Sequence, residues 1–165
     1  MFSLRHCLIF MAAALLALAG CAANIPADVT RQVTYEGDFQ TLQQSPDQYT
    51  DEFVIFGGKI LETRNLEDTS ELLVLQFPTD DNHRPQTDKA SGGRFLVRAD
   101  TFLDPAVYRP GTWITVAGTV AGAETRSIGA YDYMHPVIQG QTWTWDPDSG
   151  GFPRIHFGIG VGTTF

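Results

Sequence analysis

The residue with the most chemical options in this chain is Cys21, because a cysteine here can be a reactive thiol, half of a disulfide, the end of a membrane helix or an attachment point. The other cysteine, Cys7, lies in the apolar segment that opens the sequence. Arg5 precedes an uninterrupted apolar run from Leu8 to Ala19, which is shorter than the roughly 20 residues that span a bilayer. A basic start, a short apolar run and small residues at its end are typical of a secretory signal peptide.

The four residues that end at Cys21, Leu18-Ala19-Gly20-Cys21, resemble the bacterial lipobox, in which cleavage precedes the cysteine and its sulfur takes a lipid. We predict that residues 1–20 are removed as a signal peptide and that Cys21 becomes the acylated first residue. In the alternative, a signal cleaved near Ala19 leaves Cys21 as a free thiol. Because Cys7 would leave with the signal, the mature chain has no internal disulfide and depends on a packed core.

The remaining reactive residues do not form a catalytic pattern. Three histidines (His83, His135 and His156) lie far apart without metal-ligand spacing, and the acidic loop 79–88 lacks the spacing of an EF-hand. No Gly-x-Ser-x-Gly element is present. We therefore predict no enzyme activity, no metal and no cofactor. A hydrolase that uses Asp100, Asp104 or a nearby arginine is the alternative.

Two groups of side chains are candidates for binding a ligand. Arg94 and Arg98 would form a polar site near the end of a strand, although such residues often brace a loop. Aromatic residues gather near the end of the β-rich region, and aromatic side chains on a barrel surface can stack on sugars or bases. The alternative is that they fill the barrel or pack against the N-terminal tether. These four residues are Tyr131, Tyr133, Trp143 and Trp145.

The charge of the chain narrows the class of ligand. It has 11 Lys and Arg against 19 Asp and Glu, a formal net charge of −8. Proteins that bind nucleic acid carry a basic patch or stripe, and none is visible in this sequence. We therefore predict no nucleic-acid partner and favour a glycan or peptide as ligand.

Alternating apolar residues predict strands over 94–100 and 112–122, and a continuous apolar run predicts a strand buried on both faces over 71–77. Residues 52–65 and 131–145 are also strand-like. Residues 37–52 predict one or two short helical turns, with Ser45 before Pro46 at a helix start. Gly57-Gly58 predicts a bulge or sharp bend, and Pro136 limits its strand to an edge or a break. Because no long helical segment occurs, we predict an all-β fold: a small OB-like closed or partly closed barrel of about five or six strands with short helical turns.

Several stretches, in this order, resemble the Slp family of outer-membrane lipoproteins of Gram-negative bacteria: FGGKILETRN, LLVLQFPTDDNHRP, GGRFLVRADTFLDPAVYRPGTWITVAGTVAG and YDYMHPVIQGQTWTW. The resemblance implies an outer-membrane location and a link to starvation or stress, without an established molecular activity. In the usual sorting rule, Asp after the lipidated cysteine retains a lipoprotein in the inner membrane. Ala22 stands there instead, which implies the outer membrane and its periplasmic leaflet.

These observations predict four segments: a signal peptide (1–20), a tether (21–34), a β-barrel domain (35–148) and a glycine-rich tail (149–165). We interpret the alternating apolar tail as loosely docked or flexible, and the alternative is the last strand of a transmembrane barrel. The predicted role is non-catalytic, in envelope maintenance or stress response through binding. The expected partners are outer-membrane lipid through acylated Cys21, the lipoprotein processing and sorting machinery, and peptidoglycan or an envelope protein.

Overall fold

The structure, a computed structural model, describes residues 25–145 and 153–154. The predicted signal peptide, Cys21, Ala22 and residues 155–165 lie outside the described residues. The described residues therefore comprise most of the predicted barrel domain and the last part of the predicted tether.

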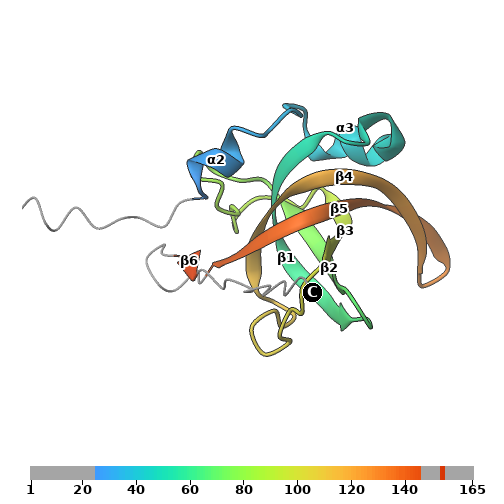
Figure 1. The fold of residues 1–165 in the computed structure, drawn as a ribbon. Helices are drawn as coiled ribbons and strands as arrows, with labels where there is room; N and C mark the ends of the chain where they lie inside the picture. Colours follow the sequence, from blue (N-terminus) through green and yellow to red (C-terminus); the bar gives the residue numbers. More distant parts are fainter. Residues whose placement is uncertain (1–24, 146–152, 155–165) are drawn as a thin grey trace, which may run out of the picture.

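Five strands form a closed ring. They are β1 (Phe53–Asn65), β2 (Ser70–Phe77), β3 (Gly93–Ala99), β4 (Trp113–Ile128) and β5 (Tyr131–Trp145). The antiparallel order is β3-β2-β1-β4-β5, and a parallel pairing of β3 with β5 closes the ring (Figure 1). A two-residue strand, β6 (Pro153–Arg154), pairs with the end of β5. The predicted all-β barrel is confirmed.

The interior of the ring is filled by apolar side chains from alternate strand positions, as the period of two predicts. Phe95 is fully buried and packs with Phe56 and Phe39, whose ring comes from helix α3 (Phe39–Gln44). Asp38 caps this helix, because its carboxylate accepts a hydrogen bond of 2.7 Å from the Thr41 amide. Helix α3 is thereby fixed across one opening of the barrel (Figure 1). A 3₁₀ turn, η1 (Pro46–Tyr49), follows Ser45 as the sequence predicts.

Two details of the strands test predictions made from the sequence. The register of β1 shifts between Ile60 and Glu62, while Gly57 and Gly58 pair regularly on both sides, so the predicted bulge at the two glycines is wrong. Glycine is needed at 58 for space, since a Cβ there would lie 2.6 Å from the Leu75 carbonyl oxygen. Pro136 lies inside β5 and does not end it, opposite a register shift in β4.

A second apolar cluster lies on the outside of the barrel. Ile25 precedes the short helix α2 (Ala27–Thr30) and Val29 lies within it, and both are buried in one cluster with Trp143 and Trp145 of β5. This part of the predicted tether is packed onto the wall of the barrel (Figure 1).

Candidate binding groove

The wall of the barrel is incomplete beside β5. Strand β3 pairs with β5 only through Leu96–Arg98, opposite Val137–Gln139, and then turns away after Ala99. Strand β6 pairs with β5 only at Thr144 and Trp145. Within the described ranges, the edge of β5 between these pairings, Gly140–Trp143, has no neighbouring strand on the side opposite β4.

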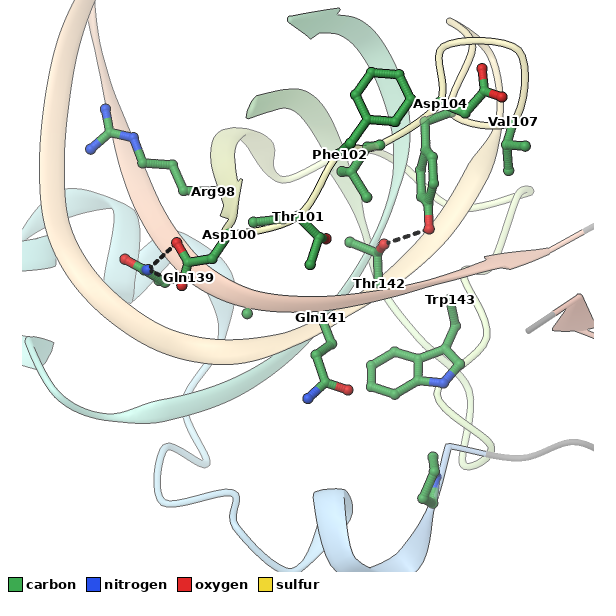
Figure 2. Close-up of a pocket in the computed structure, with 15 residues that line it drawn as sticks. Arg98, Asp100, Thr101, Phe102, Asp104, Val107, Gln139, Gln141, Thr142 and Trp143 are labelled. Carbon is green, nitrogen blue, oxygen red and sulfur yellow. Dashed lines mark hydrogen bonds between the residues drawn. The ribbon is translucent and has the colours of Figure 1, made fainter. Parts of the chain in front are cut away.

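A groove of about 750 Å³ lies along this open edge. The β3–β4 loop (100–112) forms one side through residues 100–108, and Gln139–Trp143 of β5 form the other (Figure 2). Pro26, next to the start of α2, also lines it. Amide, carboxylate and hydroxyl groups alternate with apolar surface, and Phe102 stands 71% exposed on the loop. The groove thus offers both hydrogen-bonding groups and apolar surface to a ligand.

Hydrogen bonds hold the loop side of the groove in place. The carbonyl of Asp104 accepts from the amides of Val107 and Tyr108 at 2.9 Å, which forms a turn and directs the Tyr108 ring into the barrel. The Thr142 hydroxyl on β5 donates to the Tyr108 hydroxyl at 3.2 Å (Figure 2). On β2, Ser70 accepts from the amide of Leu103 at 2.9 Å. Both sides of the groove are therefore fixed by buried or half-buried contacts.

The two carboxylates of the hydrolase alternative line this groove but take part in local hydrogen bonds. Asp100 accepts from the side-chain amide of Gln139, with both oxygens at 3.0 Å (Figure 2). Asp104 accepts from the amide of Ala106 at 2.8 Å within its own turn. Both carboxylates thus brace the loop, and the geometry gives the hydrolase alternative no support.

The arginines named from the sequence have different surroundings. Arg98 bonds to the carboxylates of Glu71 and Glu124, whereas the main-chain amide of Arg94 donates to the Tyr133 hydroxyl. Arg126 holds Glu71 through two hydrogen bonds of 2.7 Å, and these bonds raise the pKa of its guanidinium. Arg98 therefore belongs to an ion-pair network that joins β2, β3 and β4.

Three further members of this ion-pair network, Glu71, Glu124 and Arg126, were not predicted from the sequence. Glu71 opens an apolar strand, so its charge was the available signal that a partner would be needed. Glu124 and Arg126 lie beyond residue 122, where the strand prediction stopped. Their partners therefore could not be foreseen.

The four aromatic residues do not form one surface. Tyr131 is 80% exposed at the tip of the β4–β5 hairpin, and Tyr133 is half-buried with its hydroxyl on Arg94 and Gln43. Trp143 and Trp145 lie at the other end of β5, only 6% and 8% exposed. The two tryptophans pack against the tether, which was the alternative interpretation of these aromatic residues.

His135 is the buried titratable group of this region. It is 1% exposed, and its ring lies 4.8 Å from that of Tyr133. Burial lowers the pKa of the imidazole, and the nearby arginines 126 and 94 act in the same direction. The fold thus favours a neutral His135. Among the described residues no three His, Cys, Asp or Glu side chains meet as a metal site, and no helix is long and apolar enough to cross a bilayer.

The ring of five strands with one open edge defines a small β-barrel domain. The sequence model of the family described as "Outer membrane lipoprotein Slp family" matches residues 18–151, and the chain belongs to this family. Its location is accordingly the outer membrane.

Three relatives show how far the similarity reaches. An uncharacterized lipoprotein of Escherichia coli, YeaY, is 31% identical over 124 residues, which are 75% of this chain and 64% of YeaY. The outer membrane protein Slp of E. coli is 29% identical, over 76% of this chain and 69% of that protein. An uncharacterized protein of Haemophilus influenzae is 31% identical, over 63% of this chain and 71% of its own length. The chain thus spans about two thirds of each relative.

A solved structure also resembles the fold. The Pot1pC domain of Schizosaccharomyces pombe, crystallised with single-stranded DNA, matches with a TM-score of 0.35 and 11% identity, over 62% of this chain and 84% of that one. A likeness this distant supports no inference about a ligand.

Proposed function

We propose that this chain is a lipid-anchored, non-catalytic module that works at the periplasmic face of the outer membrane by binding an envelope component through the groove. The observation that carries this proposal is the groove itself, which is built on a rigid barrel and has an open strand edge along one side. Family membership supports the anchor, with Cys21 as the acylated residue and Ala22 as the sorting residue.

The position of the barrel follows from the packing of Ile25. It lies four positions after Cys21, and an extended chain spans at most about 14 Å over that distance. Ile25 is 5% exposed on the barrel, so the proposed anchor holds the domain close to the bilayer surface. Pro26 lines the groove, which therefore lies beside the proposed point of attachment. We expect the ligand to be a peptide or glycan within reach of the membrane.

The anchor can be tested by changing its two residues. The Cys21→Ser variant is expected to lose at least about nine tenths of its outer-membrane signal, because no stable anchoring remains without acyl chains. The Ala22→Asp variant should be acylated but remain in the inner membrane. Separation of the two membranes on a density gradient, followed by immunoblotting, measures both, and Ala22→Ser is the matched control. Unchanged outer-membrane recovery of Cys21→Ser would refute the lipid anchor.

The groove can be tested by a photoreactive amino acid at Gln141, which is exposed on β5 in the groove. In intact cells we expect a discrete adduct with an envelope protein or peptidoglycan fragment, identified by mass spectrometry. The same probe at Ser127, exposed on the distal part of β4, is the matched control. A pattern at Gln141 that equals that at Ser127 would contradict binding through the groove.

A further inference from the structure

We propose that Ile155–Gly158 of the C-terminal segment dock in the groove as a continuation of β6 and complete the wall of the barrel. This inference goes beyond the proposed function and does not depend on it. It rests on the register of β6, on the open edge of β5 and on the alternation of the sequence that follows Arg154.

The register of β6 already directs the chain along the open edge. Pro153 pairs with Trp145 and Arg154 pairs with Thr144, in the antiparallel sense. Continuing this register residue by residue brings Ile155 opposite Trp143 and Phe157 opposite Gln141. The same count brings Gly158 opposite Gly140.

The docked strand has a defined end. The next position on β5, Gln139, is already paired with Arg98 of β3, so a strand from the other direction has to leave there. The sequence at this point is Gly158-Ile159-Gly160, and glycine adopts the conformations that a chain needs to turn out of a sheet. The added strand would then run from Pro153 to Gly158, close to the usual strand length of about 5–6 residues.

The alternation of the segment fits the two faces of the open edge. Residues opposite each other in a sheet share a face, so Ile155 and Phe157 would lie on the face of Trp143, beside the apolar cluster that contains Ile25. His156 and Gly158 would lie on the other face, beside the hydroxyl of Thr142. Ile155 would thus meet the apolar surface of Trp143, and His156 would meet the hydroxyl of Thr142.

An open edge that lies next to its own hairpin favours an occupant from the same chain. In an antiparallel ladder, alternate residues of β5 direct their N–H and C=O groups away from β4, and a strand on that side satisfies them. A segment tethered by β6 is present at an effective concentration on the millimolar scale, which a free peptide has to match. An envelope ligand would therefore have to displace this segment or bind on top of it.

Disulfide trapping in the full-length lipoprotein tests the register. We expect the pair Gln141→Cys with Phe157→Cys to form an intramolecular disulfide in the oxidising periplasm, with a yield about tenfold above that of the mismatched pair Gln141→Cys with Gly158→Cys. Mass spectrometry of a non-reduced digest identifies the link. Equal yields for the two pairs, or a link found only between two copies of the chain, would overturn the proposal.

A second measurement avoids the cysteine variants. Hydrogen exchange of the full-length protein is compared with that of a chain that ends at Arg154. We expect at least one amide within Gly140–Trp143 to exchange about tenfold faster after truncation, because its hydrogen-bond acceptor is removed. Unchanged exchange across these four residues would overturn the docking.

The two proposals fail separately. Matched disulfides together with an adduct-free groove in cells would support the docked segment and refute ligand binding there. An envelope adduct at Gln141, with no preference between the disulfide pairs, would do the opposite.

Discussion

The Gly140→Val variant is expected to lose about 3 kcal/mol or more of its free energy of unfolding. A Cβ at Gly140 would lie 2.1 Å from the carbonyl oxygen of Ala117 and 2.5 Å from the Cα of Gly118. Both atoms belong to the backbone of β4, so no side-chain rotation can remove the clash. Gly118 is the residue opposite, and a Cβ there would lie 2.2 Å from the Gln139 carbonyl oxygen. Two glycines thus permit the close approach of β4 and β5 at this point of the barrel wall.

Urea unfolding, followed by circular dichroism, measures the loss. The matched control is Gly129→Ala in the β4–β5 turn, where glycine has a φ of 63° and a Cβ would have no neighbour within 4 Å. That variant bears only the cost of a left-handed backbone, about 1–2 kcal/mol. A loss at Gly140→Val no greater than that at Gly129→Ala would show that the strands can separate without cost.

Most of the strands could be predicted because their burial alternates locally. The boundaries of β5 and the approximate extents of β1 and β3 follow from strand-like apolar patterns, and β2 follows from its continuous apolar run. The distal part of β4 was missed because Ala123–Ile128 carries alternate charged and small residues with little apolar signal. Its partners are the ion-pair network and the facing half of β5, and both are set by tertiary structure.

The groove could not be predicted for a different physical reason. It exists because β3 ends at Ala99 while β5 continues to Trp145, and this offset appears only when the two strands pair in parallel. The burial of Trp143 and Trp145 could not be predicted either, because an outward-facing aromatic side chain is exposed or buried according to which segment covers it. Here the segment around Val29 covers both tryptophans. Its helix, Ala27–Thr30, is a single turn, which is too short to give a periodic pattern in the sequence.

Replacing Glu71 with glutamine is expected to lower the free energy of unfolding by about 2–3 kcal/mol. The Glu71 side chain is only 7% exposed and neutralises Arg126, with Arg98 also in contact. The amide cannot carry that charge, so two guanidinium groups lose their shared counter-ion. Because those arginines are 26% and 39% exposed, water screens part of the loss, and the effect stays below that of a fully buried pair.

The matched control is Glu62→Gln, which breaks an ion pair with Arg64 whose side chains are about half exposed. That change should cost less than about 0.5 kcal/mol in urea unfolding. Similar losses for the two variants would contradict a structural role for the buried carboxylate. Arg126 and Glu124 lie on the distal part of β4, and the hydrogen bond from Arg126 to Glu71 fixes that part of the hairpin to β2.

Acidification should weaken the same ion-pair network. Hydrogen bonds and charge from Arg126 come first in holding the pKa of Glu124 below its usual value of 4.5, followed by the charge of Arg98. A carboxylate whose pKa is lower in the folded state stabilises the fold above its unfolded pKa, and this contribution is lost as the pH falls through the folded value. We therefore expect the stability of the wild type to drop more between pH 6 and about pH 3 than that of Glu124→Gln. Thermal unfolding across this range measures the difference, and parallel curves would show that the network contributes nothing to it.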